Sequence, residues 1–76
     1  MEILVERNAY PVRGLADNAR VHLPEATTIR GLLRAQGTPQ EEDPWLLPCV
    51  RGTPVALDYT LRDGDRLSLY RLSIGG

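Results

Sequence analysis

A chain of 76 residues is long enough for one small domain, near the lower limit for a fold that rests on its own core. Charged residues make up 25% of the sequence and the formal net charge is −1, so the chain lacks the basic excess that nucleic-acid binding requires. We therefore expect no nucleic-acid partner. The first residues are acidic with a short apolar run, and no stretch approaches membrane-spanning length. We expect a cytoplasmic protein with no membrane partner.

The side chains that most often carry chemistry are scarce. Cys49 and His22 each occur once, which excludes an intrachain disulfide and leaves no His and Cys cluster for a metal. A lone strand cysteine usually behaves as a small apolar residue, so a reactive Cys49 is the minor alternative. All nine basic residues are Arg, which biased codon use explains most simply. Without Lys, the chain cannot build lysine-linked chains on itself.

The first part of the chain predicts two strands joined by a long loop. Residues 2–7 are rich in aliphatic and β-branched side chains, as strands are. Residues 8–18 hold the Asn, Pro, Gly and Asp residues of turns, over more positions than a tight hairpin needs. Residues 19–23 alternate apolar with polar side chains, which favours a half-buried strand.

The next segment predicts a short helix. Thr27 or Thr28 can cap its start, and Gly37 stands where a left-handed residue commonly ends a helix. Apolar residues three and four positions apart share one face, namely Ile29, Leu32 and Leu33. A helix of about ten residues is not stable alone, so this one must pack on a sheet.

An acidic segment, residues 40–44, follows the helix. A triplet of acids could suggest a metal site. Consecutive acids in a loop are more often solvated surface, and we favour that interpretation.

Residues 45–51, 54–57 and 66–70 predict three further strands. The first of these strands, residues 45–51, carries apolar side chains on both of its faces. Leu47 and Cys49 lie on the same face. Because only one face of the strand can meet the helix, we expect the other to be an exposed apolar surface.

The apolar phase switches near Tyr70. Leu67 and Leu69 share one face of the last strand, whereas Tyr70, Leu72 and Ile74 continue on the opposite one. Tyr70 and Leu72 are therefore apolar groups beside the final residues, and a partner surface explains this better than a packing error.

The sequence ends on Gly75 and Gly76. Glycine has no Cβ and costs the most backbone entropy to order, so such a tail contributes little to a fold but leaves its carboxylate unhindered. This pattern suggests that the carboxylate of Gly76 is the reacting group. A frayed terminus is the alternative.

The elements run strand, strand, helix and then three strands. The economical layout is an α+β fold in which a mixed sheet of four to five strands packs on one helix. The first and last strands pair side by side in its middle. We expect one domain over residues 1–76, with a flexible tail from about residue 72.

Three motifs together resemble the ubiquitin-like β-grasp family. They are Val50-Arg51-Gly52-Thr53-Pro54-Val55, Leu61-Arg62-Asp63-Gly64-Asp65-Arg66-Leu67 and the final Gly75-Gly76. The first two are similar to the prokaryotic sulfur carriers of thiamin and molybdopterin synthesis, although Arg51 stands where family members often carry Asn. The resemblance covers most of the chain, most firmly residues 28–76.

The resemblance implies a protein substrate rather than an enzyme, with no cofactor bound. An E1-like adenylating enzyme would use Mg-ATP to convert the carboxylate of Gly76 into an acyl-adenylate. A persulfide could then yield a thiocarboxylate that donates sulfur, through a synthase or thiolase, to a cofactor or tRNA precursor. Alternatively, an E2-like enzyme could join the tail to target amines, and a deconjugating protease could release it. A β-grasp interaction domain with an inert tail is a third possibility.

The resemblance also implies roles for individual residues. Gly75 and Gly76 would enter the channel of the partner enzyme, where Gly76 reacts. Three residues would position the tail, namely Arg71, Leu72 and Ile74. Three others would form the partner-docking surface, namely Tyr70, Leu47 and Cys49.

Overall fold

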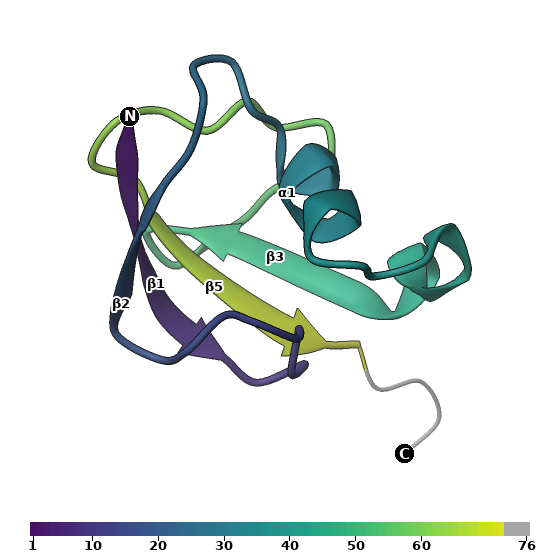
Figure 1. Ribbon diagram of the computed structural model, residues 1–76. Helices are drawn as coiled ribbons and strands as arrows, with labels where there is room; N and C mark the ends of the chain where they lie inside the picture. Colours follow the sequence, from purple (N-terminus) through teal and green to yellow (C-terminus); the bar gives the residue numbers. More distant parts are fainter. Residues whose placement is uncertain (73–76) are drawn as a thin grey trace.

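Five strands form one mixed sheet, and a single α-helix crosses one face of it in the computed structural model, which describes residues 1–72 (Figure 1). The strands are β1 (Glu2–Asn8), β2 (Ala19–His22), β3 (Leu46–Val50), β4 (Thr53–Pro54) and β5 (Arg66–Arg71), and the helices are α1 (Ile29–Ala35) and the 3-10 helix η1 (Gln40–Trp45). The strand order is β2-β1-β5-β3-β4, with β1 and β5 parallel and the other pairs antiparallel. The predicted central pairing of first and last strands is confirmed.

Helix α1 begins at the predicted cap. The Thr28 hydroxyl accepts a hydrogen bond from the backbone N–H of Gly31 at 3.0 Å, which satisfies one of the free donors of the first turn. The three predicted apolar residues of α1 are buried. Gly37 adopts a φ of +84°, the left-handed conformation expected after a helix end. The helix has 7 residues, fewer than predicted.

The core lies between α1 and the sheet and is largely aliphatic. It also includes residues from the long connection between β1 and β2, which closes one end of the core. The buried members are Ile3, Val5, Tyr10, Val12, Leu15, Ile29, Leu32, Leu33, Leu46, Val50, Leu61, Leu67 and Leu69. Burying aliphatic side chains at this density is the main favourable contribution to folding in so small a domain.

The turn between β3 and β4 places two residues in the left-handed region. Arg51 and Gly52 form a two-residue loop with φ values of +52° and +80°. This conformation is uncommon for a residue other than glycine, so Arg51 is the unusual member of the pair. Its guanidinium lies 3.4 Å from the carboxylate of Asp65.

A short strand follows the turn as predicted, but its predicted bounds of 54–57 are wrong. Strand β4 covers only Thr53–Pro54. The chain turns immediately afterwards, where the backbone N–H of Tyr59 donates to the carbonyl of Ala56 at 3.0 Å. Apolar composition alone did not reveal this turn, because the partly buried Val55 and Leu57 pack on the core from an irregular segment.

The Asp63-Gly64-Asp65 motif joins the last strand to the first. The backbone N–H of Glu2 donates to the Asp63 side chain at 2.7 Å, and Gly64 donates back to the Glu2 carbonyl at 2.8 Å. Asp65 is only 1% exposed. Its carboxylate accepts from the backbone of Arg62 at 2.9 Å and from the hydroxyl of Tyr59 at 3.1 Å, as a buried charge must be satisfied.

We expect Tyr59→Phe to lower the unfolding free energy at neutral pH by about 1 kcal/mol, because it removes the hydrogen bond to Asp65. Burial and this hydrogen bond raise the pKa of Tyr59 above its ordinary value of 10.0. The contribution of the phenol is therefore fully present below pH 10.0 and is lost as the pH rises through the folded-state pKa. Denaturant unfolding from neutral to alkaline pH should show a shallower alkaline decline for the variant than for the wild type. Tyr70→Phe, at an exposed tyrosine, is the matched control, and an unchanged decline in Tyr59→Phe would contradict the prediction.

The acidic segment folds into η1, and two of its acids, Glu42 and Asp43, contact side chains elsewhere in the domain. Its first turn is closed by the backbone N–H of Glu42, which donates to the carbonyl of Pro39 at 3.0 Å. The Asp43 side chain is 16% exposed and forms ion pairs with Arg34 and Arg30 of α1. The prediction of solvated surface is therefore wrong for Asp43. No helix within residues 1–72 is long and apolar enough to cross a membrane.

Candidate functional site

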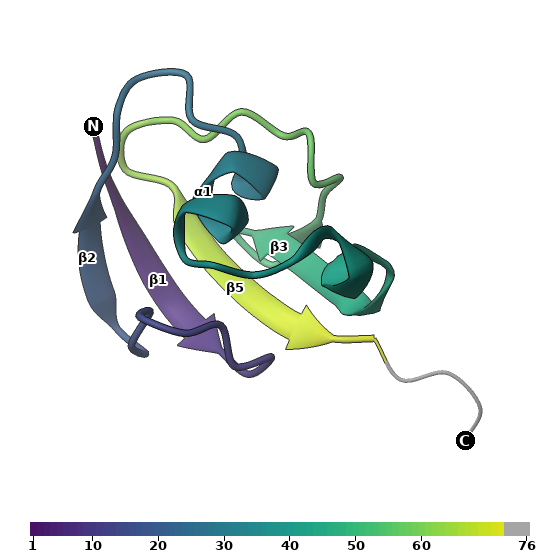
Figure 2. The same ribbon diagram turned by 45° about the vertical axis from the view of Figure 1, so that its right-hand side comes forward.

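The end of β5 is held by β3 and by the last residue of η1. Its Arg71 is paired with Leu46 of β3, and the next residue continues the pairing, because the N–H of Leu72 donates to the Trp45 carbonyl at 2.7 Å. Figure 2 shows the connection between β1 and β2 at the same end of the sheet. The residues just before Ser73 therefore occupy defined positions between η1 and the long loop.

An apolar surface surrounds this strand end. Trp45 is 42% exposed, Tyr70 36% and Leu72 38%, and these are the exposed large apolar residues of the part that the structure describes. The partly buried Leu47 lies directly across from Tyr70 in the β3–β5 pair. We call Trp45, Leu47, Tyr70 and Leu72 the terminal apolar patch. Clusters of exposed apolar side chains of this kind commonly mark protein–protein contact surfaces.

Cys49 contributes little to this surface. It lies across from Ser68 in the β3–β5 pair and is only 7% exposed. Its thiol is free and buried. A partner protein would therefore meet Tyr70 and Leu47 before it met Cys49.

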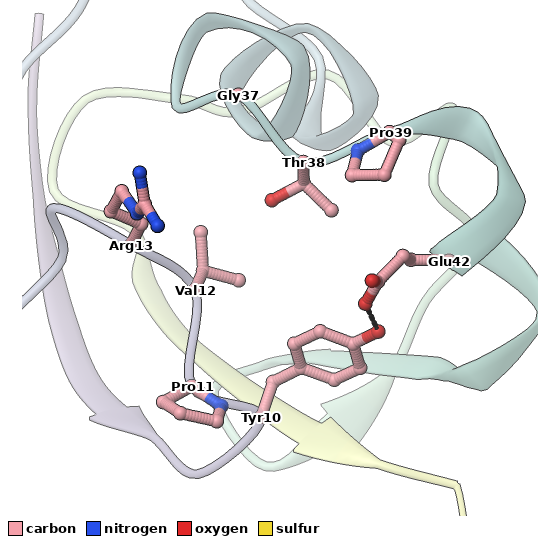
Figure 3. Close-up of a pocket in the computed structure, with 8 residues that line it drawn as sticks. All are labelled: Tyr10, Pro11, Val12, Arg13, Gly37, Thr38, Pro39 and Glu42. Atoms are coloured by element: carbon pink, nitrogen blue, oxygen red, sulfur yellow. Dashed lines mark hydrogen bonds between the residues drawn. The ribbon is translucent and has the colours of Figure 1, made fainter.

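Arg71 lies over Tyr10, which is in turn bound by Glu42. Its guanidinium carbon lies 5.5 Å from the centre of the Tyr10 ring, within the range of a cation–π interaction. The Tyr10 hydroxyl donates to the Glu42 carboxylate, as Figure 3 shows. Burial, followed by the interaction with Glu42, raises the pKa of Tyr10 above 10.0, and Arg71 opposes part of this shift. The phenol is therefore neutral at physiological pH and remains a donor. We call Tyr10, Glu42 and Arg71 the Arg71 clamp.

The long loop between β1 and β2 places Tyr10 through the side chain of Asn8. The Asn8 amide nitrogen donates to the carbonyls of Val12 and Leu15, each at 2.7 Å, and its oxygen accepts from the N–H of Val12 at 2.8 Å. These bonds fold the loop back toward Asn8, and Tyr10 lies within the part of the loop that they close. An open pocket of about 260 Å³ remains between this loop and the segment after α1. Figure 3 shows Val12 and Thr38 facing each other across it.

The structure brings four of the predicted site residues together at one end of the sheet, namely Leu47, Tyr70, Arg71 and Leu72. The predicted site residues Ile74, Gly75 and Gly76 lie outside the described residues. Sequence reasoning missed three residues of this region, namely Tyr10, Glu42 and Trp45. The position of Trp45, two residues before Leu47, was a usable signal for the patch, whereas no local pattern linked Tyr10 or Glu42 to the strand end. Over residues 1–72, no three His, Cys, Asp or Glu side chains are grouped to hold a metal ion.

Neither the protein-family models nor the curated protein sequences give a match. Among solved structures, SAMP1 from Haloferax volcanii matches over 100% of this chain and 98% of its own, with a TM-score of 0.59 and 21% sequence identity. At this identity the likeness establishes the fold, which is the ubiquitin-like β-grasp. The predicted fold class is confirmed.

Proposed function

We propose that this chain is a ubiquitin-like sulfur carrier of the cytoplasm, and that an E1-like enzyme adenylates the carboxylate of Gly76. The observation that carries the proposal is the terminal apolar patch. It lies around the last strand, directly before the sequence Ser-Ile-Gly-Gly. An enzyme docked on the patch would be next to the residues that enter its active site. ATP and Mg²⁺ belong to that enzyme in this proposal, and the chain itself is its substrate.

The chemistry follows from the poor reactivity of a carboxylate. Attack of a Gly76 carboxylate oxygen on the α-phosphorus of ATP forms an acyl-adenylate and releases pyrophosphate, and AMP is then a good leaving group at the acyl carbon. The terminal sulfur of a protein persulfide displaces AMP to give an acyl disulfide. A thiol cleaves its S–S bond, forming a new disulfide and leaving the thiocarboxylate on Gly76. A synthase or thiolase then transfers this sulfur to its acceptor.

Conjugation to target proteins is the second candidate, and the similarity to SAMP1 favours it, since SAMP1 is a ubiquitin-like modifier protein. In this route, a cysteine of the activating enzyme or of an E2-like enzyme takes the acyl group as a thioester. A lysine amine of the target then forms an amide with Gly76, and a deconjugating protease would reverse the reaction. Both candidates share the adenylation step and the same docking surface.

Mass spectrometry of the protein and its cellular proteome distinguishes the two candidates. Intact protein purified from its native cells should contain a species in which one sulfur replaces one oxygen at Gly76 if the chain is a sulfur carrier. If the chain is a modifier, trypsin should leave Leu-Ser-Ile-Gly-Gly on target lysines, because Arg71 is the last basic residue. A strain with Gly76 deleted is the control for both signals. Absence of both from wild-type cells would contradict activation at Gly76.

A further inference from the structure

We propose that Tyr10 and Glu42 are positioning residues for the reacting tail, and that they act through Arg71. The inference rests on the proposed function, because it assigns a role in the activation of Gly76. It adds two residues to the site from segments far from the tail in sequence.

The first step in the argument is the way in which Arg71 is held. Strand pairing fixes its backbone opposite Leu46. Its side chain extends over the ring of Tyr10, with 5.5 Å between the guanidinium carbon and the ring centre. Arg71 therefore has both its backbone and its long side chain engaged before any partner binds.

The second step is that the platform under Arg71 is itself fixed. Tyr10 is 8% exposed and belongs to the hydrophobic core. Its hydroxyl is bound by Glu42 of η1. The ring cannot turn away without breaking this bond and exposing apolar surface.

The third step concerns the residue that follows. The N–H of Leu72 donates to the carbonyl of Trp45, and Trp45 ends the same 3-10 helix that carries Glu42. Helix η1 thus contacts the strand end twice, once through the Glu42 and Tyr10 pair and once through its last carbonyl. Together, these contacts hold the backbone of Arg71 and Leu72 in place at the end of β5.

Holding Arg71 and Leu72 in advance lowers the conformational entropy that a partner must remove on binding. The advantage lies in the formation of the complex, because Tyr10 acts on Arg71 and Glu42 acts on Tyr10. Loss of the clamp should therefore raise KM and leave kcat unchanged.

The first test examines the clamp without an enzyme. In NMR spectra of the wild-type chain, the Tyr10 ring should shift the Arg71 side-chain proton signals, and the Leu72 amide should be protected from hydrogen exchange. Tyr10→Leu should abolish the ring shift, and Tyr10→Phe should retain it. Arg71 signals that are identical in the wild type and Tyr10→Leu would overturn the proposal.

The second test uses ATP–pyrophosphate exchange by the E1-like enzyme that activates the wild-type chain. Tyr10→Leu and Arg71→Gln should each raise KM about two- to fivefold, which corresponds to the loss of one exposed cation–π interaction. Because the two residues act through one contact, the double variant should show no larger effect than either single variant. Tyr10→Phe keeps the ring but loses the hydrogen bond to Glu42, so its KM should lie between those of the wild type and Tyr10→Leu. Glu42→Ala should raise KM in the same direction, and Glu41→Ala, at the exposed neighbouring acid, is the matched control.

The outcomes separate this inference from the proposed function. If the wild-type chain supports exchange but Tyr10→Leu and Arg71→Gln have multiplicative effects, Tyr10 acts only through the fold and the positioning role is wrong. Folded variants with an unchanged KM would overturn it equally. If no E1-like enzyme of the source organism supports exchange with the wild-type chain, the proposed function fails, and the positioning role fails with it. Arg71→Gln replaces an exposed residue, so the test survives even if Tyr10→Leu does not fold.

Discussion

Deletion of Gly75 and Gly76 is expected to abolish adenylation while leaving the domain folded. Strand β5 ends at Arg71, and the core of the part that the structure describes is built from residues 3–69, so the unfolding free energy should change by less than about 0.5 kcal/mol. Activation should fall to background because the deletion moves the carboxylate away from the position that a narrow active site can reach. Thermal unfolding and ATP–pyrophosphate exchange measure the two effects on one preparation.

A chain extended by one alanine is the matched control for this deletion. It keeps all 76 residues but moves the carboxylate off Gly76, so it too should lack exchange activity. Wild-type exchange by either variant would show that Gly76 is not the reacting residue. Loss of folding on deletion would instead show that the last residues contribute to stability.

Replacement of Tyr70 by Ser is expected to weaken binding to the activating enzyme by at least about tenfold, as truncation of a central aromatic residue does in many interfaces. Tyr70 lies in the middle of the terminal apolar patch, between Leu47 across the strand pair and Leu72 along the chain. Because it is 36% exposed, the cost to the unfolding free energy should stay near 1 kcal/mol. Calorimetric titration of the enzyme with each variant measures the change in Kd.

Arg66→Ser is the control for this substitution. Arg66 is an exposed residue at the opposite end of the same strand, so it tests whether any polar replacement on β5 weakens binding. Equal affinities for the wild type and Tyr70→Ser would exclude the terminal apolar patch as the docking surface. An equal loss in both variants would point to a general effect of β5 on the fold.

The features that the sequence predicted well are those with local signals. Thr28 caps α1, and the buried face of the helix consists of the residues that the three- and four-residue spacing predicted, namely Ile29, Leu32 and Leu33. The phase switch at Tyr70 also proved reliable, since Leu67 and Leu69 are fully buried whereas Tyr70 is exposed. In each case, side chains a few residues apart report directly on which face meets the core.

The features that the sequence did not predict depend on distant parts of the chain. Tyr10 and Glu42 are 32 residues apart, and neither belongs to a periodic pattern. The place of Tyr10 depends on the bonds made by Asn8 within an irregular loop. Asp43 was misjudged for a similar reason, because its ion pairs with α1 arise from the tight 3-10 turn and not from its neighbours in sequence.

The central position of β5 also has a consequence for how the protein is made. The parallel β1–β5 pair joins residues from the two ends of the sequence, and β3 also pairs with β5. A nascent chain on the ribosome cannot complete this sheet until residues 66–71 have emerged, since contacts between such distant segments form only once both are present. Ribosomes that stall earlier release fragments without their middle strand. Only a chain that has been translated through β5, the strand before the terminal glycines, can therefore form the complete sheet.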